Sequence, residues 1–236
     1  MAATEVHSIL LDIEGTTTPI SFVHDVLFPY ARVHLRPYLE QYSDSLEVRA
    51  DLARLREEHA LDAGEGHQPP PLIEEYVYWL IDRDRKSPAL KSLQGKIWEQ
   101  GYKDGTLKSP VFADVPPALQ RWRDTGISVN IFSSGSVLAQ KLLFAHTVAG
   151  DLTKFINSYF DTRVGKKTDG ESYRRIATTL SLAGNQIHFI SDVLTELDAA
   201  ANAGMKTSLC VRPGNAVQVR SSRHKIIQSF EGIGAT

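Results

Sequence analysis

The stretch Val6–Pro19 (VHSILLDIEGTTTP) decides the fold of this 236-residue chain. Its first part, Val6–Leu11, is a short apolar run that predicts a buried strand. The strand ends abruptly in a polar turn that carries two carboxylates, Asp12 and Glu14. In open α/β sheets ligands collect at the carboxyl ends of the strands, so we expect this turn to form part of a site.

After this strand the pattern of the chain changes twice. Helical periodicity runs from about His24 to Gly105 without a convincing strand, and the Gly- and Pro-rich stretch Leu61–Pro71 interrupts it as a loop. We expect Pro37 to end the first of these helices, because proline tends to stop or kink a helix. After Phe112 short apolar or β-rich runs alternate with helical segments. These runs are Ile127–Phe132, Phe155–Phe160, Ile187–Ile190 and Thr207–Val211.

Strands that alternate with helices predict an α/β fold with a doubly wound parallel sheet covered on both faces. Three of the predicted strands end in oxygen-rich turns, although these turns lie far apart in the sequence. A parallel sheet brings such turns to one edge, and this convergence is the main evidence for an active site. The turns contain Asp12 with Glu14, Ser133 with Ser134, and Asp192.

Composition excludes several classes of function. A formal net charge of −2 gives no reason to expect nucleic-acid or anionic-membrane binding. No run approaches the roughly 20 apolar residues that cross a bilayer, and no secretory signal is visible. The single cysteine, Cys210, lies in an apolar run and is expected to be a buried thiol in a reducing compartment.

The pair Asp12 and Glu14 suits phosphoryl transfer. One carboxylate could attack phosphorus, while the other could protonate the leaving oxygen and later activate water. Gly15 and the threonines after it would allow the backbone to approach a phosphate. The alternative interpretation is that Asp12 only caps the turn.

Ser133 and Ser134 stand between a strand and a helix, where hydroxyl and N–H donors suit a phosphate oxygen. The alternative is an ordinary serine N-cap. Lys166 and Lys167 follow Gly165 in a polar loop, and one of them could neutralise the phosphate and the carboxylates. A lysine pair of this kind can also be a solvated surface feature.

Asp192 ends a predicted strand and, with Asp12, offers two hard oxygen ligands of the kind that Mg²⁺ prefers. Glu196 is expected to support this group indirectly. For Asp198 we prefer the simpler interpretation of favourable charge in the first turn of a helix.

Taken in order, strand–Asp-x-acid, strand–Ser, Lys and strand–Asp are the motifs that define the haloacid dehalogenase superfamily. Within it the chain resembles the enolase-phosphatase (acireductone synthase) family from His7 to Ala216. Glu14 followed by Gly15–Pro19 is a specific feature, because most phosphatases of the superfamily carry aspartate at that position. The stretches that carry the resemblance are Asp12–Ile20, Phe28–Tyr30, Leu93–Gly95, Ile131–Val137, Ala139–Phe144 and Val211–Ala216.

The resemblance implies a Mg²⁺-dependent enzyme of L-methionine salvage. Such an enzyme enolises 2,3-diketo-5-methylthiopentyl-1-phosphate and then removes phosphate to give the acireductone 1,2-dihydroxy-3-keto-5-methylthiopentene. It implies Asp12 as nucleophile, with Asp12, Glu14 and Asp192 as ligands of one Mg²⁺ per subunit. Glu14 would bind through its backbone carbonyl and keep its carboxylate as general acid and base. The substrate-binding positions of the family match Ser133, Ser134 and Lys167, the last chosen over Lys166 by its offset from Gly165.

The same resemblance implies a Rossmann-like catalytic core from residues 1–20 and 106–236, with an all-helical cap from residues 21–105 inserted after the first motif. A cap can exclude water and offer apolar surface to the methylthio tail. We expect a cytoplasmic monomer, with a nuclear pool left open, that binds a small phosphorylated diketone and neither nucleic acid nor membrane. The apolar run Ile226–Phe230 is expected to pack as a terminal helix.

Three alternative functions differ from this one in properties that can be tested. The nearest is a phosphatase of the same superfamily for another small metabolite, such as a sugar phosphate or phosphoglycolate, which would hydrolyse esters that lack the diketone. A halide-releasing dehalogenase is poorly supported, because it would need no Mg²⁺ and Asp192 would be superfluous. A catalytically inactive binding protein would have no reason to retain the whole set of predicted site residues.

Overall fold

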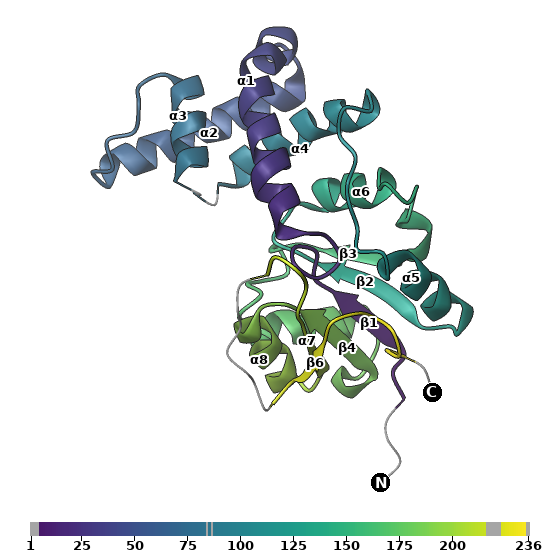
Figure 1. Ribbon diagram of the computed structural model, residues 1–236. Helices are drawn as coiled ribbons and strands as arrows, with labels where there is room; N and C mark the ends of the chain where they lie inside the picture. The colour runs from purple at the N-terminus through teal and green to yellow at the C-terminus, as the bar shows by residue number, and fades with distance from the viewer. Residues whose placement is uncertain (1–4, 84, 86, 216–222, 235–236) are drawn as a thin grey trace. The chain divides into compact units, whose positions relative to one another are not determined.

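A computed structural model describes residues 5–83, 85, 87–215 and 223–234. The chain divides into two compact units (Figure 1). One unit, here called the α/β unit, consists of Met1–Val23 and Lys108–Thr236. The other, here called the helical unit, consists of His24–Leu107.

The α/β unit is built on a six-stranded sheet with the order β3-β2-β1-β4-β5-β6, in which every neighbouring pair is parallel. This confirms the predicted α/β fold class. The strand order reverses at β1, which lies between β2 and β4, and ligands of such sheets bind at this switch point. The strands are β1 (Ser8–Leu11), β2 (Ser128–Phe132), β3 (Ser158–Phe160), β4 (Ile187–Ser191), β5 (Lys206–Cys210) and β6 (Lys225–Ile227).

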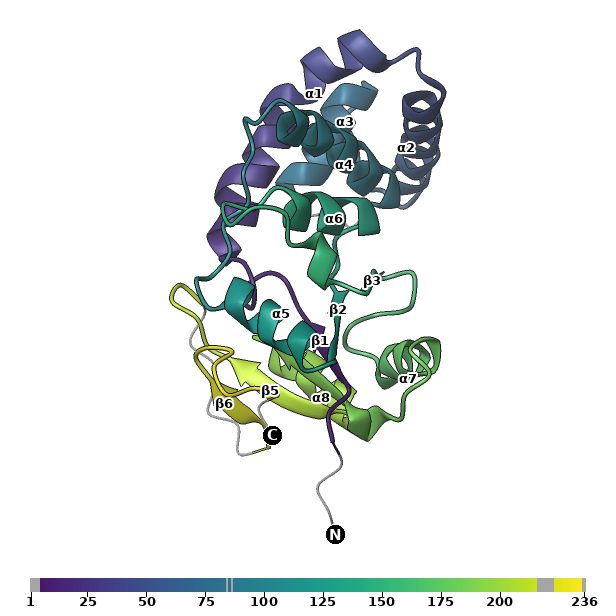
Figure 2. The same ribbon diagram turned by 90° about the vertical axis from the view of Figure 1, so that its right-hand side faces the viewer.

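Helices cover both faces of the sheet because side chains of a strand alternate between the faces. Ile9 and Leu11 of β1 belong to a buried cluster that also contains side chains of α5 and α6, whereas Leu10 belongs to a cluster with α7 and α8 (Figure 2). Two short 3₁₀ helices, η2 and η3, precede β3 and β4. The helices are α5 (Val115–Asp124), α6 (Val137–Ala145), η2 (Thr153–Phe155), α7 (Gly170–Thr179), η3 (Gly184–Gln186) and α8 (Leu194–Asn202).

The end of the chain differs from its expected form. The first two residues of the run predicted as a terminal helix, Ile226 and Ile227, belong to β6, a short edge strand that pairs with β5. Phe230 and Ile233 follow it and are buried in the cluster on the α5 side of the sheet. The helix prediction was wrong because the β-branched pair Ile226 and Ile227 favours an extended edge that pairs with β5.

The helical unit contains four α-helices preceded by a π-helix. α4 packs against α1 and α2, and α2 also packs against α3. Serine side chains begin two of the helices, since Ser45 accepts a hydrogen bond from Val48 N and Ser87 accepts one from Leu90 N. Among the residues that the structure describes, no helix has both the length and the apolarity to span a bilayer. The elements are η1 (Phe22–Leu27), α1 (Phe28–Tyr42), α2 (Leu46–Gly64), α3 (Ile73–Asp82) and α4 (Pro88–Lys103).

Pro37 does not end the first helix as expected, because α1 continues through it to Tyr42. Proline removes the N–H that would bond to the carbonyl four residues earlier, at Val33. The Val33 side chain is 70% exposed, so this stretch of the helix faces solvent and water can satisfy the freed carbonyl.

His188, on β4, makes the stability of the fold sensitive to acid. Burial, with smaller contributions from Lys206 and Lys225, lowers the pKa of His188 to about 4. Because the unfolded pKa is about 6.5, the neutral histidine stabilises the fold above that pH, and the contribution is lost as pH falls towards 4. We expect this group to remove about 2 kcal/mol of unfolding free energy between pH about 7 and about 5.

The variant His188→Gln tests this prediction, since glutamine can retain a hydrogen bond to Ser208, whose Oγ lies 2.8 Å from His188 Nε2. Urea unfolding at several pH values should give a shallower loss of stability below neutral pH for the variant than for the wild-type protein. If the unfolding free energy of the two proteins fell equally with pH, His188 would not be the source of the acid sensitivity.

Candidate active site

The site begins with the loop that leaves β1. Asp12 N donates to Ile190 O at 3.0 Å, which continues the β1–β4 ladder to the first residue of the loop. The loop then closes on itself, because three successive N–H groups, those of residues 16–18, donate to Ile13 O. Gly15 has a φ of +70°, and a Cβ there would collide with the Asp192 carboxylate. Only glycine fits at this position, so the loop turns tightly against Asp192.

Asp12 lies at the centre of a buried polar cluster and is 3% exposed. Its Oδ1 lies 2.6 Å from Lys167 Nζ and accepts a hydrogen bond from Ile13 N at 2.8 Å. Its other oxygen, Oδ2, accepts a hydrogen bond from Ser191 Oγ at 2.9 Å. The carboxylate is therefore held in one orientation by a cation, a hydroxyl and a backbone amide.

Lys167 bridges two carboxylates, because its Nζ also lies 2.7 Å from Glu196 Oε2. Burial alone would lower the pKa of Lys167, but the charges of Asp12 and Glu196 raise it well above its usual range. Tyr173 Oη donates to the Lys167 carbonyl at 2.7 Å and fixes the backbone. The neighbouring Lys166 is exposed, so the structure brings only the second lysine of the pair to the cluster.

Ser133 and Ser134 lie in the turn between β2 and α6. Ser133 is buried, and its Oγ donates to Glu14 Oε2 at 3.4 Å and accepts from Gly135 N at 3.1 Å. Ser134 is half-buried. The N-cap of α6 is a different residue, Ser136, whose side chain accepts from Ala139 N. The N-cap interpretation of Ser133 and Ser134 is therefore wrong.

The cluster contains more negative than positive charge. Burial first, and then the charge of Asp12, raises the pKa of Asp192 to about 7 and that of Glu196 to about 7. The same two causes raise the pKa of Glu14. Two buried carboxyl groups, those of Asp12 and Asp192, and two half-buried ones, those of Glu14 and Glu196, thus share one lysine. A hard divalent cation fits this set of oxygen donors in charge and in chemistry.

Sequence reasoning missed several residues that hold this site together. Ser191 Oγ links Asp12 to Glu196, to which it lies at 3.1 Å, and Glu196 also pairs with Lys167. Arg212 and Asn215 donate to the loop carbonyls Thr16 O and Gly15 O. Arg212 and Asn215 could have been noticed in the sequence, because they lie in the stretch after β5 that carries part of the family resemblance, but no role was assigned to them there.

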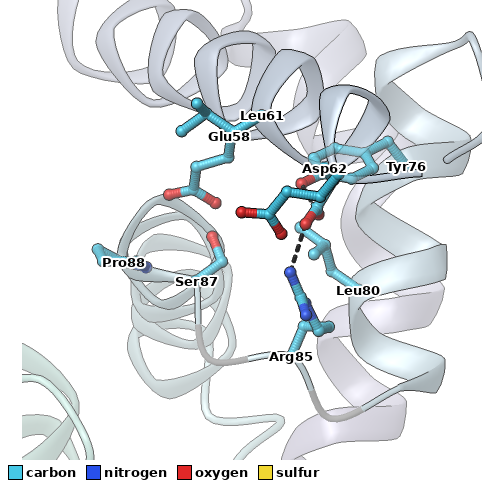
Figure 3. A pocket seen from close by; sticks show the side chains of 9 residues that line it. Glu58, Leu61, Asp62, Tyr76, Leu80, Arg85, Ser87 and Pro88 are labelled. Atoms are coloured by element: carbon cyan, nitrogen blue, oxygen red, sulfur yellow. Dashed lines mark hydrogen bonds and ion pairs between the residues drawn. The ribbon is translucent and has the colours of Figure 1, made fainter. Parts of the chain in front are cut away.

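A second polar group lies in the helical unit and lines an open pocket of about 490 Å³ (Figure 3). Its buried Asp62 accepts a hydrogen bond from Tyr76 Oη at 2.7 Å and pairs with Arg85. Asp62, Glu65 and His67 also place their ligand atoms within 4.8 Å of one another, the only such group in the described residues. Arg85 already neutralises the buried carboxylate, so this group ties α2 to α3 and to the segment before α4.

The carboxylates of Asp12, Glu14 and Asp192 do not meet that three-ligand distance limit within the described residues. The Glu14 carboxylate is turned towards Ser133 Oγ.

Comparison with known proteins identifies the family. Residues 6–204 match the model of the haloacid dehalogenase-like hydrolases. An enolase-phosphatase E1 of Synechococcus elongatus is 52% identical, over 95% of this chain and 96% of the relative. The enolase-phosphatase E1 of Xenopus tropicalis is 42% identical, over 88% and 86% of the two chains. The chain belongs to the enolase-phosphatase E1 family.

Solved structures agree with this assignment. The UTR4 protein of Saccharomyces cerevisiae is 36% identical and superimposes with a TM-score of 0.80, over 97% of this chain and all of that one. CbbY of Rhodobacter sphaeroides, crystallised with phosphate, is 18% identical with a TM-score of 0.61 over 97% of this chain and 96% of that one, which shows the shared fold. The resemblance seen in the sequence motifs is confirmed, and the chain is a hydrolase of the haloacid dehalogenase type.

Proposed function

We propose that this protein is an acireductone synthase of L-methionine salvage. It would enolise 2,3-diketo-5-methylthiopentyl-1-phosphate and then hydrolyse the phosphate ester. The observation that carries the proposal is the buried Asp12 carboxylate, paired with Lys167 and lying beside Glu14 at the switch point of the sheet. The family membership supports the choice of substrate.

In the phosphatase step Asp12 acts as the nucleophile. An Asp12 oxygen forms a bond to phosphorus while the bond from phosphorus to the substrate oxygen breaks, giving an aspartyl-phosphate. Glu14 donates its proton to the leaving oxygen, a role that its raised pKa supports. Glu14 then takes a proton from water, which attacks phosphorus and releases inorganic phosphate and the free Asp12 carboxylate.

Substrate phosphate would be bound by Ser133, Ser134 and Lys167. The hydroxyls donate to phosphate oxygens, and Lys167 balances charge between Asp12 and the substrate. The helical unit would act as the cap that excludes water and receives the methylthio tail. Cytoplasmic location and the monomeric state remain predictions, and so does a nuclear pool.

One Mg²⁺ would be held by Asp12, Asp192 and the backbone carbonyl of Glu14. When bound, the ion supplies a positive charge between two anions and polarises a substrate oxygen. The excess of carboxyl groups over lysine in this cluster supports the assignment. Asp192 would give up its proton on binding the ion, so we expect Mg²⁺ affinity to fall as pH drops below about 7.

The direct test is phosphate release from the diketone phosphate, with and without Mg²⁺, while the ultraviolet absorbance of the enol is followed. We expect metal-dependent release preceded by an absorbance transient. Release from simple sugar phosphates or phosphoglycolate, but not from the diketone, would retain the phosphatase and reject the substrate. A protein that released phosphate from none of these esters would be a binding protein instead.

A further inference from the structure

The segment after β5 forms a tight turn in the α/β unit. Asn215 N donates to Arg212 O at 3.1 Å, and Pro213 and Gly214 occupy the two central positions. Gly214 has a φ of +87°, as the third residue of a type II turn requires. Arg212 and Asn215 therefore flank a rigid turn, and both side chains reach the loop that follows β1.

These two side chains hold consecutive carbonyl groups of that loop. Asn215 Nδ2 donates to Gly15 O at 2.9 Å, and Arg212 Nε donates to Thr16 O at 3.1 Å. Arg212 is itself buried and fixed by both oxygens of Asp114, at 2.8 and 2.9 Å. The loop that carries Asp12 is therefore fastened by the turn after β5 as well as by its own hydrogen bonds.

The Asn215 amide can have only one orientation. Both partners of Nδ2 are carbonyl oxygens, Gly15 O and Cys210 O at 3.5 Å, which accept but do not donate. Oδ1 must then point away from them. This oxygen is buried and accepts no hydrogen bond from the residues that the structure describes.

Asn215 Oδ1 lies next to a proposed metal ligand. A Cβ built on Gly15 would collide with Asp192 Oδ2 and lie 3.1 Å from Asn215 Oδ1, so the two oxygens flank the same point. Asn215 Oδ1 is a buried acceptor, and burial of an acceptor is unfavourable unless a donor reaches it. Mg²⁺ retains several of its waters in protein sites, and such waters are strong donors.

We propose that Asn215 is a positioning residue of the metal site. Its Nδ2 fixes the Gly15 carbonyl, and its Oδ1 accepts a hydrogen bond from water in the hydration shell of an ion bound beside Asp192. The inference rests on the proposed Mg²⁺ site, and it adds a residue from the turn after β5 to the loops that form that site. Partners of this kind orient the ligands of a metal and tune its affinity.

The experiment is calorimetric titration of the full-length protein with Mg²⁺, without substrate, together with the rise in melting temperature that Mg²⁺ causes. We expect Asn215→Ala to weaken Mg²⁺ binding about 10- to 100-fold. Asn215→Asp retains an acceptor oxygen but loses the donor to Gly15 O, so it should weaken binding far less. Asn202→Ala, on the exposed side of α8 where Asn202 pairs with Arg223, is the matched control.

The two Asn215 variants distinguish the contribution of Nδ2 to Mg²⁺ affinity from that of Oδ1. Equal losses in Asn215→Ala and Asn215→Asp would assign Asn215 a purely structural role through Nδ2 and overturn the inference. Unchanged affinity in both would overturn it as well, while the proposed function would stand. A wild-type protein that bound no Mg²⁺ would overturn the metal site itself, and phosphate release measured in parallel separates that failure from a wrong substrate.

Discussion

The variant Asp12→Asn should lose turnover by about 10⁴-fold or more while it keeps its fold. Asparagine has the size of aspartate, but its amide cannot form the acyl-phosphate bond that the proposed mechanism requires. Lys167 retains Glu196 as a partner at 2.7 Å, and the variant removes one of several mutually repelling carboxylates. We therefore expect a melting temperature close to that of the wild-type protein.

The measurements are kcat for phosphate release and mass spectrometry of the protein after rapid quenching with substrate. The wild-type protein should carry a phosphoryl group and the variant should not. Asp198→Asn is the matched control, because this half-exposed aspartate of α8 pairs with Arg223 and His224 and makes no contact with Asp12 or Lys167 that the structure records. Retained turnover in Asp12→Asn would reject Asp12 as the nucleophile.

Replacement of Lys167 by methionine should impair both activity and stability. The side chain is buried between Asp12 and Glu196, so its loss leaves two carboxylates without their cation. Breaking a buried ion pair on one side costs about 3–5 kcal/mol, and removing one electrostatic group from the site lowers kcat by about 10²–10³-fold. The stability loss should shrink as pH falls from about 8 towards about 5, because burial and the charge of Asp12 raise the pKa of Glu196 to about 7 and protonation then neutralises that carboxyl.

Lys166→Met provides the control for the same change of side chain one residue earlier. Lys166 is exposed, so Lys166→Met should have the same stability and the same kcat as the wild-type protein. Equal effects of the two substitutions would contradict the distinction between the lysines. A stability loss in Lys167→Met that did not vary with pH would point to packing rather than charge as its cause.

Much of the cluster could be predicted from sequence because the parallel register brings it together. Asp12, Ser133 and Asp192 each stand within one residue of the end of a strand, and β2, β1 and β4 are neighbours in the sheet. Short runs of apolar residues are enough to locate such strands. Because ligands of a parallel sheet bind at the carboxyl ends of its strands, the turns that follow these strands can then be assigned to one site.

Other parts of the site depend on contacts between residues that are far apart in the sequence, and such contacts leave no local sequence pattern. Asn215 and Gly15 are 200 residues apart, and Arg212 and Asp114 are 98 residues apart, so neither pair can be found by spacing. Lys167 was chosen over Lys166 through the family resemblance, by its offset from Gly165, because the polar loop sequence alone does not indicate which of the two side chains is buried. The edge strand at Lys225–Ile227 was missed because three residues are too few to show a period.

The position of β1 in the centre of the sheet has a consequence for synthesis of the chain on the ribosome. Ser8 bonds to Asn130, 122 residues later, and Asp12 bonds to Ser191, 179 residues later. One edge of the nascent first strand therefore stays unpaired until β2 has emerged, and the other until β4 has emerged. The helical unit, in contrast, can fold during elongation from contacts within itself. We expect a nascent chain halted before β4 to lack the reactive carboxylate environment altogether, so that competence for catalysis arrives only near the end of translation.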